Sequence, residues 1–177
     1  LRLGYADGVF VITYWEHLLP VAPGTYDQIL THRLDQLLEA PGANDPGVQE
    51  LQSIITAIGY LPQRNETDPE RIVERHREKE IIKRRLAALY DESEPVRAAI
   101  DATVQEYNGT PGDPGSFNLL ESLIDRQAYR PAFWRVATEE INYRRFFDIN
   151  ALAAIRVELP DVLQAPHRLV FELLSTG

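Results

Sequence analysis

The residues with the most potential for chemistry lie in one stretch, NYRRFFDINALAAIRVE, which covers residues 142–158. It places adjacent arginines, three aromatic rings and two carboxylates in a chain whose net charge is −9. Arginine offers five fixed hydrogen-bond donors, and aromatic rings offer apolar faces. Together these groups suit a large, neutral, hydroxyl-rich ligand such as a sugar chain. The candidate binding residues are Asn142, Tyr143, Arg144, Arg145 and Phe146.

An extended strand turns successive side chains to opposite faces, so one face of this stretch would meet a ligand while the other packs in a core. Five arginines oppose three acidic residues across residues 129–156, a local balance of +2 in an acidic chain. Tyr129 and Trp134 are weaker candidates, and Asp148 is expected to fix an arginine or cap a turn. The same residue types also suit a buried strand with salt-bridged arginines, and chemistry alone does not separate the two interpretations.

Two segments of the chain resemble a known family. The run QAYRPAFWRVATEEINYRRFFDINALAAIRVE, residues 127–158, resembles the corresponding segment of maltooligosyltrehalose synthases, members of the α-amylase superfamily. The opening run YADGVFVITYWEHLLPVAPGTYDQIL, residues 5–30, is also similar to that family. Residues 41–116 are similar only in helical character and length.

The resemblance implies an internal piece of a longer cytoplasmic enzyme, located between the third and fourth strands of a (β/α)8 barrel. That enzyme is an isomerase that needs no organic cofactor. By intramolecular transglucosylation it converts the terminal α-1,4 bond of a maltooligosaccharide into the α,α-1,1 bond of trehalose. The motif that carries its nucleophile would begin just beyond Gly177, so the chain alone is expected to be inactive. The absence of Met and the start at Leu1 agree with an internal piece.

The residues themselves provide no evident catalytic machinery. A retaining glycosidase needs two carboxyl groups about 5 Å apart across the scissile bond. Glu139 and Glu140 are neighbours whose side chains diverge on either a strand or a helix, so we expect a structural role for both. The four histidines lack metal-like spacing, and no metal site is predicted. No GxSxG, P-loop or GxGxxG motif occurs.

Composition excludes several classes of function. The chain has no cysteine, which excludes disulfides and thiolate catalysis. A net charge of −9 argues against a nucleic-acid surface, and no apolar run approaches the roughly 20 residues of a membrane span. The expected partners are therefore a glucan and the remainder of the parent barrel. Two alternatives stay open: a helical protein-interaction or scaffold module, and a glucan hydrolase or 4-α-glucanotransferase of the same superfamily.

The pattern along the chain predicts a mainly α fold with a small β-hairpin and a C-terminal part derived from a (β/α)8 barrel. Residues 1–128 would form the hairpin and a helical insertion region. Residues 129–177 would form a barrel-associated segment that lines the substrate pocket. Alternation around Asp7 and Gly8 predicts the hairpin, with a second strand to Trp15. Helices are expected at residues 25–39, 45–59, 68–90, 93–107, 116–126 and 160–174.

Several capping and side-chain pairing patterns support these helices. Asp45, Asp68 and Ser93 precede proline-containing first turns and are expected N-caps. Thr25 and Gln28 have the spacing of a capping box, and Ser116 is the expected cap of the next-to-last helix. Pro166 predicts a kink in the final helix. In the long charged helix, Glu80 should pair with Arg84, and the expected buried stripe is Ile72, Val73, His76, Ile82, Leu86 and Leu89.

Overall fold

The structure, a computed structural model of the chain, describes residues 1–39, 45–131 and 155–176. It is mainly helical with one small antiparallel sheet, which confirms the predicted fold class at that level. The chain divides into two compact units, Leu1–Arg126 and Gln127–Gly177. Of the elements in the described residues, the sheet and all helices but the last belong to the first unit.

The sheet contains three antiparallel strands in the order β1 (Arg2–Ala6), β2 (Val9–Tyr14) and β3 (His17–Pro20). The first hairpin is confirmed, because Ala6 pairs with Val9 across an Asp7–Gly8 turn. Both turn residues have positive φ, 49° and 76°, as a two-residue turn between right-twisted strands requires.

The prediction of a lone hairpin was incomplete, because a third strand follows. β2 ends at Tyr14, and Tyr14 pairs with His17 across the two residues Trp15 and Glu16. The pattern did not reveal this turn because Trp15 takes a positive φ of 53°, which is rare for a bulky residue. Pro20 ends β3 at the edge of the sheet, where its missing N–H costs no ladder bond.

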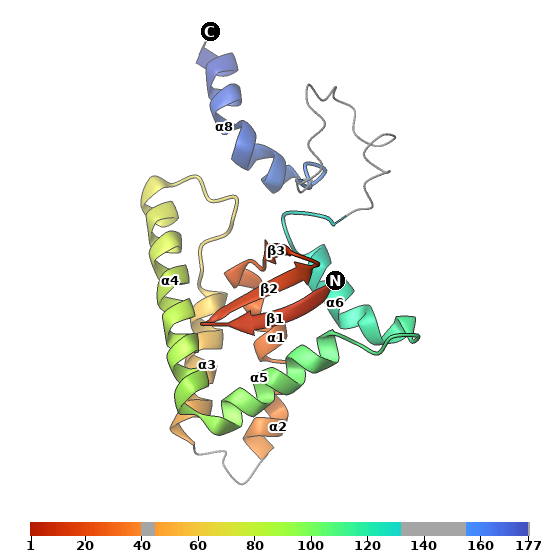
Figure 1. Cartoon of the computed structure of the whole chain (residues 1–177). Coiled ribbons are helices and arrows are strands. Elements are labelled where there is room, and N and C mark those ends of the chain that lie inside the picture. Colours follow the sequence, from red (N-terminus) through yellow and green to blue (C-terminus); the bar gives the residue numbers. More distant parts are fainter. Residues whose placement is uncertain (40–44, 132–154, 177) are drawn as a thin grey trace. The chain divides into compact units, whose positions relative to one another are not determined.

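The helices of the first unit follow the sheet in chain order and pack around it (Figure 1). The long α4 is followed by α5 at a sharp corner at Ser93. The helical segments of the first unit are η1 (Pro23–Thr25), α1 (Tyr26–Leu30), α2 (Leu34–Glu39), α3 (Pro46–Gly59), α4 (Pro69–Glu92), α5 (Glu94–Tyr107), η2 (Pro114–Phe117) and α6 (Asn118–Asp125). The second unit contains α8 (Pro160–Thr176).

Three predicted N-caps are confirmed. The side chain of Asp45 accepts a hydrogen bond from the Gly47 amide at 2.7 Å. Those of Asp68 and Ser93 accept in the same way from the first turns of α4 and α5. In each case the cap satisfies an amide that has no partner within the helix.

The capping box predicted at Thr25 is wrong. Thr25 has ψ near 4°, outside the extended region that an N-cap needs, and its hydroxyl donates back to the Ala22 carbonyl at 2.8 Å. The helix expected from residue 25 to residue 39 is also interrupted. A turn at residues 31–33 separates α1 from α2, and this turn brings His32 and Arg33 to α5.

The cap predicted at Ser116 is wrong as well. Asp113 caps η2 by accepting from the Gly115 amide at 3.1 Å. The Ser116 hydroxyl instead accepts from the Thr110 amide at 2.7 Å and so closes the preceding loop. α6 then begins at Asn118 without a side-chain cap.

The buried stripe predicted for α4 is right only in its C-terminal half. Ile82, Leu86 and Leu89 are buried, whereas Val73 and His76 are exposed. The other elements reach α4 mainly beyond its first turns, so periodicity alone overestimated its buried length. Lys83 rather than Arg84 pairs with the Glu80 carboxylate, at 2.7 Å.

The core of the first unit lies between the inner face of the sheet and the helices. Phe10 is fully buried, and its ring meets Tyr26 of α1 edge to face at 4.9 Å. The Tyr26 hydroxyl accepts from the Phe10 amide at 3.2 Å. Burial raises the pKa of Tyr26 to about 12, so this hydroxyl stays neutral. One aromatic pair of this kind contributes about 1 kcal/mol beyond its buried area.

The sheet is fixed to the helices at both ends. At one end the side chain of Asn108, the C-cap of α5, accepts from the Leu3 amide at 2.7 Å and donates to the Leu3 carbonyl at 2.9 Å. At the other end Gly8 lies directly against α4. A Cβ atom on Gly8 would lie 1.9 Å from the Lys83 carbonyl oxygen, so only glycine fits there.

Replacing Gly8 by alanine is expected to lower the free energy of unfolding by about 2 kcal/mol or more, because it combines a left-handed backbone with a backbone collision. Chemical denaturation followed by circular dichroism measures the change. Gly24→Ala is the matched control, since nothing lies within 4 Å of a Cβ at Gly24. Equal denaturation midpoints for the two variants would contradict this account of the docking.

Candidate functional site

The five predicted binding residues, Asn142, Tyr143, Arg144, Arg145 and Phe146, lie outside the described residues. The same holds for Trp134, for the Glu139–Glu140 pair and for Asp148. The structure does describe the two flanks of this segment, residues 127–131 and 155–159. These flanks are called the neck below.

The neck joins the two ends of the candidate segment. Tyr129 and Ile155 form an antiparallel bridge, and the Arg156 amide donates to the Ala128 carbonyl at 3.1 Å. The chain therefore enters and leaves residues 132–154 at one place. This isolated bridge and the adjacent hydrogen bond hold the two flanks together.

Tyr129, one of the weaker candidates, lies in the neck. The side chain is half-buried, and its hydroxyl is buried with no hydrogen-bond partner among the described residues. Burial raises the pKa of Tyr129 to about 12. The phenol is therefore a protonated hydrogen-bond donor at neutral pH, and its burial shields it from solvent.

The neck carries two arginines, Arg130 and Arg156, and one carboxylate, Glu158. Arg156 donates from Nε to the Glu158 carboxylate at 2.9 Å. The pKa of Glu158 is lowered, first by a hydrogen bond from its own backbone amide, then by Arg156, with a smaller effect of the positive charge on Arg130. Glu158 is thus an ionised partner for arginine and is unsuited to donating a proton at neutral pH.

A second polar cluster lies in the first unit, where the turn between α1 and α2 meets the end of α5. Glu106 accepts from His32 Nε2 at 2.5 Å and from the Arg33 guanidinium. The pKa of Glu106 is lowered, with Arg33 the largest cause and His32 also contributing. This cluster is an ionic link between elements distant in sequence, and an ionised carboxylate already paired with arginine is a poor general acid.

Neighbouring contacts extend the same link. Tyr107 is buried, and its hydroxyl donates to the Gln28 carbonyl at 3.0 Å. Arg126 lies 3.3 Å from the Asp27 carboxylate, which ties the end of α6 to α1. Together these bonds hold α1, α5 and α6 in register. We interpret these bonds as contacts that stabilise the fold.

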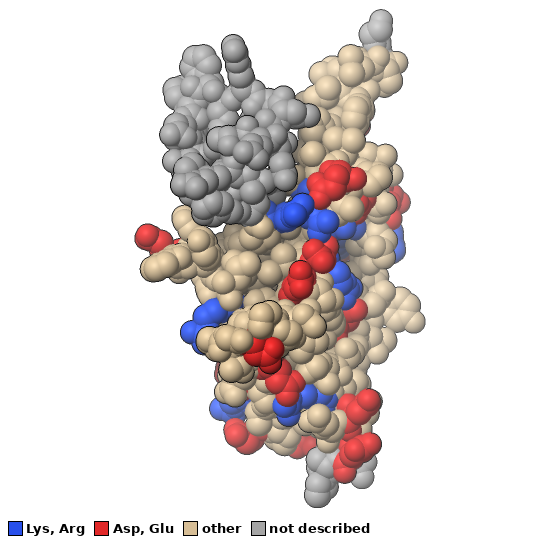
Figure 2. Space-filling model, turned by 90° about the vertical axis from the view of Figure 1, so that its right-hand side faces the viewer, with Lys and Arg blue, Asp and Glu red and all other residues tan. Residues whose placement is uncertain are grey.

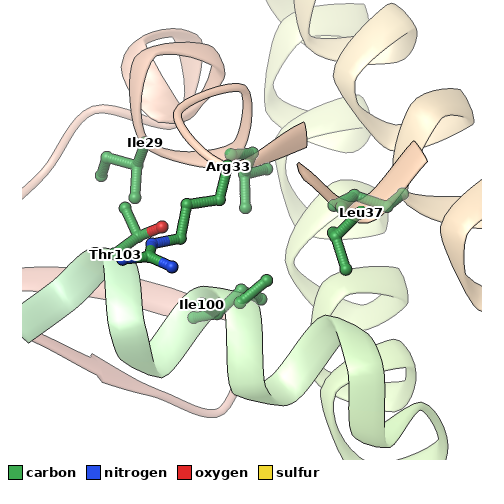
Figure 3. Close-up of a pocket in the computed structure, with 8 residues that line it drawn as sticks. Ile29, Arg33, Leu37, Ile100 and Thr103 are labelled. Atoms are coloured by element: carbon green, nitrogen blue, oxygen red, sulfur yellow. The ribbon is translucent and has the colours of Figure 1, made fainter. Parts of the chain in front are cut away.

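The crevice beside this cluster is too small for a sugar. Arg33 extends across it from the turn after α1, and its guanidinium lies beside Thr103 of α5 (Figure 3). The apolar lining includes Ile29, Leu37 and Ile100. The cavity volume is about 10 Å³, which suffices for at most one water molecule.

The surface of the described residues carries mixed charge. Figure 2 shows acidic and basic side chains interspersed over the face in view, unlike the concentrated basic patch that binds phosphate backbones. Among the described residues, no helix combines the length and apolar character needed to cross a bilayer. Within the same residues, no three His, Asp or Glu side chains gather in a way that could hold a metal ion.

One exposed aromatic residue was not singled out by sequence reasoning. Trp15 stands at the β2–β3 turn and exposes 88 % of its surface. The sequence signal is the polar pair Glu16-His17, which interrupts the alternating strand pattern directly after Trp15. A tryptophan there stands at a turn position that small or polar turn-forming residues usually occupy.

Comparisons of the chain with protein-family models, with curated proteins and with solved structures found no match.

The ionic link at Glu106 should make stability depend on pH. A carboxyl whose pKa is lower in the folded chain than in the unfolded chain favours folding above its unfolded pKa, and the advantage is lost as the pH falls through the folded pKa. Glu106→Gln is therefore expected to lower the free energy of unfolding by at most about 1 kcal/mol near pH 7. The difference from the unmodified chain should shrink as the pH falls through the lowered pKa of Glu106.

Denaturant titrations at a series of pH values test this expectation. Glu78→Gln is the control, because Glu78 pairs with its immediate neighbour Arg77 inside α4 and links no separate elements. A Glu106→Gln effect that is the same at both ends of the pH range would show that charge is not what the residue contributes.

Proposed function

We propose that the chain is part of a glucosylmutase of the maltooligosyltrehalose synthase type, and that residues 127–158 form one wall of its glucan pocket. The reaction converts the terminal α-1,4-glucosidic bond of a maltooligosaccharide into an α,α-1,1 bond. The observation that carries the proposal is the resemblance of residues 127–158, with its adjacent arginines and its aromatic rings, to that family.

The chemistry of the segment supports this assignment. Asn142, Arg144 and Arg145 act as hydrogen-bond donors to sugar hydroxyls, while Tyr143 and Phe146 provide apolar surface for the ring faces. Arginine keeps its charge at any working pH.

The reaction also explains why such a wall is needed. After cleavage the freed glucose must turn without leaving, and its anomeric hydroxyl must reach the covalent intermediate before water does. Holding the two reacting groups together can supply about 7–11 kcal/mol of the barrier, but only in an enclosed site. Hydrogen-bond donors in this segment orient the glucose, while its aromatic faces keep water away.

We assign the reactive carboxyl groups to other parts of the parent polypeptide, because the resemblance implies that they lie in later motifs of the barrel. α8 supports a role within a larger protein, because it is amphipathic and exposes several large apolar side chains. Exposed apolar surface of this extent usually marks a contact with another structure. The exposed residues are Leu163, Leu169, Val170, Phe171, Leu173 and Leu174.

The test is a product analysis of the parent polypeptide with maltopentaose. We expect reducing ends to disappear while the chain length of the sugar is preserved, with a new α,α-1,1 linkage in the anomeric region of the proton NMR spectrum. Shorter reducing sugars would instead identify a hydrolase, and a redistribution of chain lengths would identify a 4-α-glucanotransferase. No turnover at all would favour a protein-interaction module.

Replacing Arg144 or Arg145 singly by alanine in the parent polypeptide is expected to reduce kcat/KM by about tenfold or more, since each loses a charged donor to the sugar. The ratio of isomerised product to free glucose should fall as well, because a loosely held glucose is lost to water. Arg77→Ala, on the exposed face of α4, is the control and should change neither value. Unchanged turnover and product ratio would remove both arginines from the site.

A further inference from the structure

The β2–β3 hairpin presents two consecutive aromatic residues to solvent. Trp15 exposes 88 % and Tyr14 exposes 52 % of its surface. The backbone beneath them is fixed, since Thr13 pairs with Leu18 and Tyr14 pairs with His17 in the antiparallel ladder. The turn lies at the end of the sheet where β1 begins, away from the Gly8 contact with α4 (Figure 1).

Trp15 occupies its position at a cost to folding. Its φ of 53° lies in the left-handed region, which glycine and asparagine enter far more easily than a bulky residue does. The first residue of such a two-residue turn is most often glycine. An exposed indole makes little compensating contact, so fold stability does not explain a tryptophan here.

The size and charge of the surface indicate which ligand it fits. A stable protein interface covers about 800 Å² on each partner. Trp15, the half-exposed Tyr14 and the neighbouring Leu18, which is 68 % exposed, together provide only a few hundred. Nucleic-acid bases also stack on such rings, but a net charge of −9 opposes the phosphate backbone. One or two sugar rings match this area, and Glu16 and His17 beside them offer polar groups for hydroxyls.

We propose that Trp15 and Tyr14 form a glucan-stacking site at the tip of the β2–β3 hairpin, in which the indole covers the apolar face of a glucose unit. The site is separate in sequence from residues 142–146, and it rests on the proposed function only for the identity of the sugar. It holds a long α-glucan by a second contact, which raises the local concentration of chain ends.

The experiment is native affinity electrophoresis of the 177-residue chain in gels that contain glycogen, with free maltoheptaose as competitor. The unmodified chain should be retarded, and maltoheptaose should release it. Trp15→Asn removes the ring and accepts the left-handed backbone, so the dissociation constant for glycogen should rise by about tenfold. The denaturation midpoint should stay the same or increase, because the strain is relieved.

Tyr60→Asn is the control variant, because Tyr60 is also exposed but follows α3. It should be retarded like the unmodified chain. Equal retardation of Trp15→Asn and the unmodified chain would overturn the inference. So would an unmodified chain whose mobility is not changed by glycogen. A Trp15→Asn variant that unfolds at a markedly lower denaturant concentration would overturn it as well. Self-association in sedimentation runs that only Trp15→Asn abolishes would assign the tip to a protein contact instead. None of these outcomes alters the product analysis of the parent polypeptide, so the two proposals fail independently.

Discussion

The attachment of the small sheet to the helices is the constraint on which the first unit depends. Three short strands cannot form a stable sheet in water without an apolar face packed against other elements. Here Gly8 allows the backbone of one turn to touch α4, and Asn108 holds Leu3 at the other end. Phe10 and Tyr26 fill the space between these points. Because both ends are fixed, the β2–β3 turn can carry a strained, exposed tryptophan without losing its register.

The two units contribute differently to the proposed activity. In the first unit, polar contacts such as those of Glu106 and Tyr107 are used to hold helices together, and the crevice beside them has no room for a ligand. In the second unit, the neck gathers basic side chains and a protonated phenol where the candidate segment begins and ends. The glucan contacts that we propose therefore belong to the neck and its segment and to one exposed hairpin tip. The helical core positions that tip.

Local rules in the sequence predicted the features that depend on local interactions. Asp45 and Asp68 were recognisable because an N-cap followed by proline is satisfied within its own first turn. Thr25 misled the same reasoning because its hydroxyl bonds backwards to Ala22. The left-handed turn at Trp15 and the exposed half of α4 were missed, since both depend on which elements lie nearby in space. For the candidate site, residue types indicated a sugar ligand, but the pairing of Tyr129 with Ile155 joins residues too distant in sequence for any spacing rule.

The central claim is that residues 142–146 contact an α-glucan in the parent polypeptide. Hydrogen–deuterium exchange of that polypeptide, followed by mass spectrometry with and without maltoheptaose, tests it most directly. The account predicts slower exchange across peptides that cover residues 142–146, while peptides from α3 and α5 exchange at unchanged rates. Sugar-dependent protection elsewhere in the polypeptide, with none in residues 127–158, would contradict it.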